Sequence, residues 1–302
     1  MEAFLKIARA GYPCEAWVGI FFAAQVFMAV VFLAAAPYPA LSAEPLSTAS
    51  VPLIPPGTSI GERFSGEEFN YKLGFWIFDG VAVAKIKLEK TGNFYVATLT
   101  ARTTGAVRWL HAREDVYVAT LEEVDGGKRF RTLVFEENST IGSKTKRSVT
   151  TLDKNTGALK WTIWKKGVEK GNGNVVLRDG IYYDDPLAAF YNFRYGVYGK
   201  VEENKRFRIK TFPKAKGQEV DIDLHIRQAP KDGAPARGAF TPGGAGQAEE
   251  EAVYLADARM DKDLFDSSSG LVEIFFDKEL VPIKAVAKDI VLFGDVRGEL
   301  ER

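Results

Sequence analysis

The sequence contains almost no cysteine. Its single cysteine, Cys14, precedes a long apolar run near the N-terminus, and no other follows in the 302-residue chain. Disulfide bonds and cysteine metal sites are therefore excluded from residue 15 onward. Because Cys14 stands before the apolar run rather than after it, its position does not match a lipoprotein cysteine.

The sequence also lacks an excess of charge of either sign. It has 40 Lys and Arg residues and 40 Asp and Glu residues. A balanced charge gives no overall attraction for nucleic acid or for an anionic membrane surface, so we expect no nucleic-acid partner. Apolar residues make up 46% of the chain and aromatic residues 12%, which is enough for a buried core and excludes bulk disorder.

Sequence patterns of known catalytic sites are missing as well. The chain has two histidines and no HExxH, GxSxG, P-loop or GxGxxG pattern in a suitable context. His225 falls on the polar face of an alternating segment, which is typical of a solvated strand position. His111 could pair with Glu114 or Asp115, but no Ser or Cys nucleophile signature accompanies it. We therefore expect no catalytic residue, no cofactor and no enzymatic activity.

One acidic cluster invites comparison with a calcium-binding loop. It consists of Asp257, Asp261, Asp263 and Asp266. The EF-hand spacing requires a glycine where Asp266 stands, and no bidentate glutamate ends the loop. We interpret the cluster as a solvated loop and expect no bound metal.

Residues 1–43 have the features of a secretory signal peptide. Lys6 and Arg9 precede an apolar run at residues 18–36, and small residues follow that run. Cleavage is expected after Ala43, because a cut after Ala36 would place Pro37 beside it. The alternative is an uncleaved anchor in the inner membrane, since the run is just long enough to span a bilayer. Both alternatives place residues 44–302 outside the cytoplasm and predict a periplasmic protein.

The remainder divides into a short tether and one domain. Residues 44–60 are rich in Pro and Ser and are interpreted as a flexible tether. Residues 61–302 are predicted to form a single β domain. Within it, residues 228–250 are dominated by Gly, Ala and Pro, and this composition predicts a disordered loop.

Alternation of apolar and polar residues dominates the domain. Such a period of two is typical of half-buried strands. The predicted strands lie within residues 67–78, 81–90, 93–102, 115–124, 128–137, 145–153, 158–166, 205–212, 218–228, 271–277, 282–292 and 294–300. Turn signals such as Asp125-Gly126-Gly127 and Asn155-Thr156-Gly157 separate successive strands. We predict a mainly β fold: an antiparallel meander that forms a barrel or half-open barrel, with one short central helix.

The stretch DDPLAAFYNFRYG at residues 184–196 predicts that helix. Asp185 is placed as the N-cap, and Pro186 follows at the first helical position. Leu187, Phe190 and Tyr191 share one apolar face, and Arg194 follows on the same face. Such a helix could cover the open end of a barrel, and plain core packing is the alternative. A buried arginine there would need a carboxylate or an aromatic ring as partner.

Three stretches of the sequence together resemble a known family. The first carries Gly66, Glu67, Phe69, Tyr71 and Gly80. The second carries Asp185, Leu187, Ala189, Phe190, Tyr191 and Arg194, with Ala188 in place of the usual serine. The third carries Asp277, Leu280 and Pro282. Over about residues 61–300 the chain resembles a family of bacterial exported proteins catalogued as domain of unknown function 3108.

The resemblance implies a periplasmic, mostly antiparallel β domain. It implies no established activity, catalytic residue or cofactor. The residues that we assign to its structural motifs are Asp185, Pro186, Leu187, Asp277 and Pro282. The Gly- and Pro-rich insertion at residues 228–250 departs from the family pattern.

These observations predict a periplasmic, non-enzymatic β-barrel-like protein. We expect aromatic residues on inward-facing strand positions, among them Phe69 and Trp161, and an apolar small molecule or lipid as a partner in envelope maintenance. The predicted ligand-binding residues are Tyr71, Phe75, Phe190, Tyr191 and Arg194. The alternative is an interaction module that contacts other envelope proteins through sheet edges and the 228–250 loop. A hydrolase built around His111 is a third hypothesis.

Overall fold

The computed structural model describes residues 58–75, 78–110, 112–213, 220–229, 252–260, 267–290 and 294–301. The predicted signal peptide, residues 44–57 of the predicted tether and residues 230–250 of the predicted loop lie outside the described residues. No helix within these described ranges is long and apolar enough to cross a membrane.

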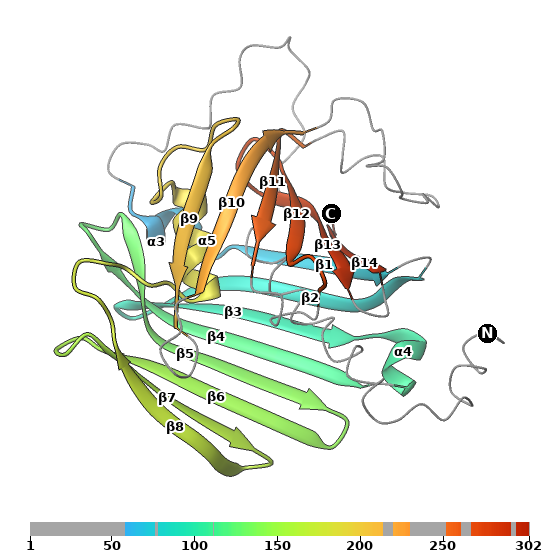
Figure 1. Cartoon of the computed structure of the whole chain (residues 1–302), viewed down its shortest axis with the longest axis horizontal. Coiled ribbons are helices and arrows are strands. Elements are labelled where there is room, and N and C mark those ends of the chain that lie inside the picture. Colours follow the sequence, from blue (N-terminus) through green and yellow to red (C-terminus); the bar gives the residue numbers. More distant parts are fainter. Residues whose placement is uncertain are drawn as a thin grey trace.

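The described strands form one antiparallel sheet of 14 strands (Figure 1). Its order is β8-β7-β6-β5-β4-β3-β2-β1-β14-β13-β12-β11-β10-β9. The strands are β1 (Glu68–Phe75), β2 (Phe78–Thr91), β3 (Phe94–Thr103), β4 (Arg113–Val124), β5 (Arg129–Ile141), β6 (Lys144–Asp153), β7 (Ala158–Lys165), β8 (Val168–Val176), β9 (Arg206–Thr211), β10 (Val220–Gln228), β11 (Tyr254–Arg259), β12 (Leu271–Phe276), β13 (Pro282–Ile290) and β14 (Gly294–Leu300).

The sheet consists of two meanders that meet at one pair of strands. Strands β1–β8 follow one another, strands β9–β14 do the same, and β14 pairs with β1. The chain passes from β8 to β9 through helix α5 (Pro186–Tyr195). Strands β8 and β9 remain as edges, so the barrel is half-open rather than closed. The predicted fold class, a mainly antiparallel half-open barrel with a central helix, is confirmed.

The alternation of the sequence explains which side of each strand is buried. In β1, buried Phe69, Tyr71 and Leu73 alternate with exposed polar residues. In β10, Ile222 and Leu224 are buried, whereas His225 is half-buried on the opposite face, as its polar position predicts.

Two short helices accompany α5 in the described residues. Helix α3 (Ile60–Phe64) starts at a capping box formed by Ser59 and Glu62, and helix α4 (Gly105–Leu110) follows β3. Ile60 and Phe64 are fully buried, so the folded domain begins before residue 61 and the predicted end of the tether is too late. The short amphipathic segment was missed because a capping box directly before a strand leaves little helical period to detect.

Strands β8 and β11 are not predicted by the sequence pattern. Strand β8 contains Gly171, Asn172, Gly173 and Asn174, which are depleted in strands and give no apolar alternation. It forms because it pairs with β7 along its length, apart from one bulge.

Helix α5 lies inside the curled sheet, where it packs against β3, β4, β5 and β9 (Figure 1). Asp185 caps the helix and Pro186 is its first residue, as the sequence predicts. Gly196 ends the helix in the left-handed conformation, with a φ of 87°. All side chains from Leu187 to Arg194 are buried. The prediction of a single apolar face was therefore too narrow, because the sheet surrounds the helix instead of lying on one side of it.

Candidate functional site

Arg194, at the C-terminal end of α5, is paired inside the barrel. Its Nη1 and Nη2 atoms donate to the two carboxylate oxygens of Glu67 at 2.7 and 3.1 Å. Its guanidinium also lies over the rings of Phe64 at 4.5 Å and Phe190 at 5.3 Å. Burial alone would lower the pKa of Arg194, but the charge of Glu67 and its hydrogen bonds raise it above the ordinary value. The arginine thus remains charged and binds a structural carboxylate.

The three sequence stretches of the family resemblance meet around this pair. Tyr71 of the first stretch donates a hydrogen bond of 3.4 Å to the carbonyl of Pro282 in the third. The carboxylate of Asp277 accepts from the backbone amides of Glu279 and Val281, both at 2.8 Å, and holds the turn before β13. This convergence gives the motif residues a role in packing: they join β1, α5 and the β12–β13 turn.

The structure places the predicted ligand-binding residues in a packed interior. Tyr71, Phe190 and Tyr191 expose 2%, 0% and 0% of their surface, and Arg194 exposes 5%. Phe75 is half-buried and its ring lies 5.7 Å from that of Phe78. The core-packing alternative therefore describes α5 better than a ligand contact does.

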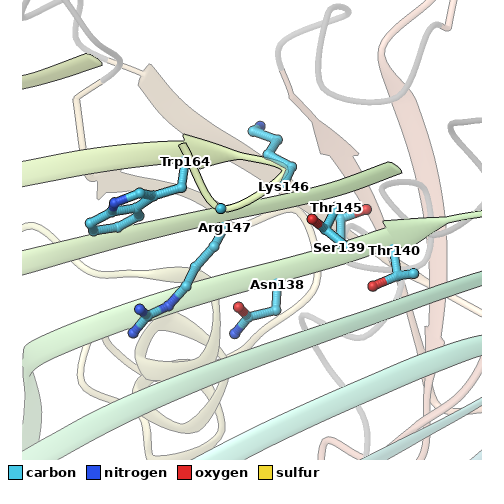
Figure 2. Close-up of a pocket in the computed structure, with 8 residues that line it drawn as sticks. Asn138, Ser139, Thr140, Thr145, Lys146, Arg147 and Trp164 are labelled. Atoms are coloured by element: carbon cyan, nitrogen blue, oxygen red, sulfur yellow. The ribbon is translucent and has the colours of Figure 1, made fainter. Parts of the chain in front are cut away.

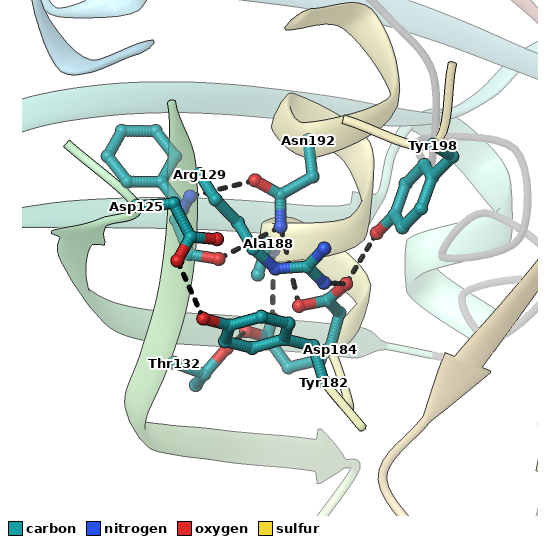
Figure 3. A network of polar contacts seen from close by, with 10 residues as sticks. Asp125, Arg129, Thr132, Tyr182, Asp184, Ala188, Asn192 and Tyr198 are labelled. Atoms are coloured by element: carbon teal, nitrogen blue, oxygen red, sulfur yellow. Dashed lines mark hydrogen bonds and ion pairs between the residues drawn. The ribbon is translucent and has the colours of Figure 1, made fainter. Parts of the chain in front are cut away.

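A second polar cluster holds the N-terminal end of α5 (Figure 3). Asp184 accepts from Arg129 on β5, from Tyr198 at 2.5 Å and from Asn192 at 3.3 Å. Asn192 also exchanges two hydrogen bonds with the backbone of Phe130, at 2.8 and 2.9 Å. The cluster therefore connects the helix to β5 through both side chain and backbone.

Asp185 lies beside this cluster and is completely buried. Its carboxylate accepts from the amide of Leu187 at 2.7 Å and from the hydroxyl of Thr132. Burial raises the pKa of Asp185 to about 7, although these hydrogen bonds oppose the change. Burial also raises the pKa of neighbouring Asp184, against the opposing influence of Arg129.

The raised pKa of Asp185 predicts how stability depends on pH. Its folded pKa of about 7 lies above the ordinary 3.8, so the folded state binds the proton more tightly than the unfolded state. The contribution of Asp185 to the free energy of unfolding is therefore fully present below its ordinary pKa and is lost as the pH rises through about 7. Asp185→Asn keeps a good N-cap and removes the titration, so the melting temperature should fall less with pH over this window.

The measurement is the melting temperature of both proteins across the window. Asp153→Asn is the control, because Lys160 and the backbone hold the pKa of partly exposed Asp153 below its usual value, so its contribution to stability has the opposite sign. Identical profiles for the parent protein and Asp185→Asn would contradict the prediction.

Strands β6–β8, here called the wing, extend the sheet beyond α5. We call the face of the sheet that packs on α5 the inner face. Along one line of direct strand partners, this face carries Ala119, Phe135, Thr150, Trp161 and Gly173. Burial is complete or nearly so at Ala119 and Phe135 and only partial at Trp161. The apolar inner face therefore continues from the core into the more open wing.

The indole of Trp161 lies against the glycines of β8. A Cβ atom added at Gly173 would meet Cζ2 of Trp161 at 2.6 Å, and one at Gly171 would meet Cζ3 at 3.8 Å. Glycine at 173 is therefore needed for the ring to lie across the neighbouring strand. Ile163, one position along the same face, and Leu152 and Val175 are also only partly buried.

The remaining candidates from the sequence do not form a catalytic group among the described residues. Asp115 is fully buried and binds Arg113 through two hydrogen bonds of 2.6 and 3.1 Å. His111, Asp261, Asp263 and Asp266 lie outside the described residues, and Asp257 pairs with Arg227 at 2.5 Å. Within the described part of the chain, no group of three or more His, Cys, Asp or Glu side chains could hold a metal ion.

Fold and site define a half-open antiparallel β-barrel whose interior is filled by one helix. No family model and no curated protein matches the sequence. Among solved structures, the chain is similar to the crystal structure of a beta-barrel-like protein of domain of unknown function DUF1849 from Brucella abortus. That similarity has a TM-score of 0.43 and 11% sequence identity, and it covers 78% of this chain and 95% of the other. The resemblance to domain of unknown function 3108 stays a prediction.

Proposed function

We propose that this chain is an exported, periplasmic, non-enzymatic protein that binds an apolar ligand, such as a lipid acyl chain, on the inner face of the wing. The observation that carries the proposal is the strip of partly buried apolar side chains at Leu152, Trp161, Ile163 and Val175. Ligand sites are lined mainly by apolar and aromatic side chains, and this strip of such side chains continues directly into the core.

The size of the strip suits a short length of acyl chain. From Leu159 to Ile163 the backbone of β7 rises roughly 13 Å, which matches about ten methylene groups. Each methylene removed from water contributes about 0.8 kcal/mol, before the costs of association are subtracted. A ligand of this kind would also cover the open side of the Trp161 indole.

The edges of the sheet suit a protein partner less well. The pairing of β8 with β7 contains a bulge opposite Ile163 and Trp164 of β7, and exposed Lys170 of β8 lies at this bulge. Bulges and edge lysines prevent strands from pairing with other chains. The β9 edge is partly occupied, because Asp184 forms a parallel bridge with Thr211. These features support a ligand on the face over strand addition at an edge.

Two tryptophans of one strand provide the test. Trp161 is on the inner face, whereas Trp164 is paired with Arg147 and has its indole under that guanidinium at 5.3 Å. We expect brominated fatty acid to quench tryptophan fluorescence of the delipidated protein in a saturable manner. Trp161→Phe should remove most of the quenching, and Trp164→Phe should retain it.

A second variant tests the geometry rather than the fluorophore. Gly173→Val should displace the indole of Trp161, because its Cβ atom would lie 2.6 Å from the ring. We expect weaker binding of the fatty acid without loss of the fold. Absence of saturable quenching, or equal loss in Trp161→Phe and Trp164→Phe, would overturn the proposed function.

A further inference from the structure

The tip of the wing carries more positive than negative side chains. The tip comprises the ends of hairpins β5–β6 and β7–β8, with exposed Lys144, Lys146, Lys165 and Lys166. Among the described residues, none of these four lysines forms an ion pair, whereas many lysines elsewhere do, such as Lys72 with Glu301 at 2.7 Å. The balanced charge of the whole chain therefore hides a local cluster of cations.

The pairing of β6 with β7 places two of these lysines side by side, which destabilises the isolated protein. Lys146 and Lys165 are direct partners in the β6–β7 pairing. Like charges placed directly opposite on neighbouring strands destabilise a sheet. The amide of Lys166 also donates to the carbonyl of Thr145 at 2.8 Å, which holds the third lysine close to this pair. An anion at the tip would relieve the repulsion.

A polar groove of about 420 Å³ adjoins the lysines (Figure 2). It is lined by Asn138, Thr140, Thr145, Arg147 and Trp164, among others. Within the part of the chain that the structure describes, the side chains of Asn138, Thr140 and Thr145 make no hydrogen bond. The groove therefore offers amide and hydroxyl donors beside cationic side chains, a combination that suits phosphate oxygens.

The acidic groups near the tip offset only part of its positive charge, and none of them forms an ion pair with the four lysines among the described residues. Glu136 is occupied by Arg147 at 2.8 Å, Glu137 accepts from Ser148 at 2.6 Å, and Glu169 accepts from Asn172 at 2.6 Å. The groove also has the aromatic wall of Trp164. Tryptophan beside lysine and arginine is the composition found where proteins meet the headgroup region of a bilayer.

We infer that the wing tip docks this protein on an anionic phospholipid bilayer, with lipid phosphates at the lysines and in the adjacent groove. The occupant follows from charge complementarity: several unpaired lysines on both sides of one sheet corner fit a continuous anionic surface. Docking in this orientation places the end of the apolar inner strip, at Ile163, next to the bilayer. The inference goes beyond the proposed function, because docking requires no bound ligand.

Vesicle sedimentation of the full chain tests the docking. Phosphatidylcholine vesicles with phosphatidylglycerol should bind the protein, and binding should weaken as salt is added. Each lysine near an anionic surface contributes about fivefold in partitioning, so Lys146→Gln with Lys165→Gln should lower it roughly thirtyfold. Lys128→Gln is the matched control, because Lys128 is exposed in the β4–β5 turn at the opposite end of β5.

The outcomes distinguish docking on an anionic bilayer from the alternative explanations. Equal binding to vesicles of phosphatidylcholine alone, or an equal loss in Lys128→Gln and Lys165→Gln, would overturn it. Binding of glycerophosphate without binding of anionic vesicles would also overturn it and indicate a soluble phosphate ligand. Any contribution of the apolar N-terminal run is the same in every variant. Fatty-acid quenching can fail while vesicle binding persists, so the two proposals are distinguishable.

Discussion

Replacing Glu67 by glutamine is expected to destabilise the protein by about 3–5 kcal/mol, the usual cost of removing one partner from a buried ion pair. The substitution preserves shape and removes only the charge. The side chain of Arg194 is 3% exposed, and a guanidinium cannot lose its proton to relieve the burial. The rings of Phe64 and Phe190 offset part of the charge but supply no anion. Urea unfolding measures the loss.

The next residue provides the matched control. Glu68 pairs with Lys85 at 2.5 Å on the outer face, where both side chains are more than 40% exposed. Glu68→Gln should therefore cost at most about 1 kcal/mol. The double variant of Glu67→Gln with Arg194→Met should recover much of the loss, because methionine suits the aromatic surroundings. Equal costs for Glu67→Gln and Glu68→Gln would show that Arg194 does not depend on Glu67.

Local sequence signals were sufficient for the start of α5 and for most strands. Asp185 caps the backbone amides of the first turn, and Pro186 is the first residue of that turn. The alternation of apolar and polar residues determines which side of a strand is buried. Such signals act over a few residues. They therefore identify an element before its neighbours are known.

The surroundings of the helix depend on residues far away in the sequence. Glu67 and Arg194 are 127 positions apart, so no spacing rule connects them. The sequence indicates a carboxylate as one possible partner of Arg194, but no local pattern identifies Glu67 as that carboxylate. In the same way, the sequence predicts that Trp161 faces inward, but its contact with Gly173 could not be predicted. Gly173 lies in β8, whose Gly- and Asn-rich composition does not indicate a strand.

Whole-chain charge was a poor guide to the local surface. The equal numbers of acidic and basic residues argued against an anionic membrane surface as a partner. Charge balance averages over all faces, whereas the register of β6 and β7 brings Lys146 and Lys165 together. Only pairing between strands shows which charges are neighbours.

Replacing Arg129 by methionine is the second change with a large expected effect. Arg129 donates to Asp184, and its guanidinium lies 4.3 Å from the ring centroid of Tyr182. In mildly alkaline buffer, its removal leaves the buried carboxylate of Asp184 without its cation, and we expect a loss of about 3–5 kcal/mol. Arg131→Met is the control on the same strand, because partly exposed Arg131 shares Glu122 with Lys154 and its loss leaves that lysine in place.

The cost of Arg129→Met should shrink as the pH falls. Burial already raises the pKa of Asp184 in the presence of Arg129, and removal of the cation raises it further. Below that pKa, Asp184 takes up a proton, the uncompensated charge disappears, and the difference in unfolding free energy between variant and parent narrows. Urea unfolding at several pH values measures this difference. A cost that stays constant with pH would indicate that Arg129 acts through its packing on Tyr182 and Tyr198. A difference that narrows as the pH falls would instead show that the charge of Arg129 holds Asp184, and with it the start of α5, inside the barrel.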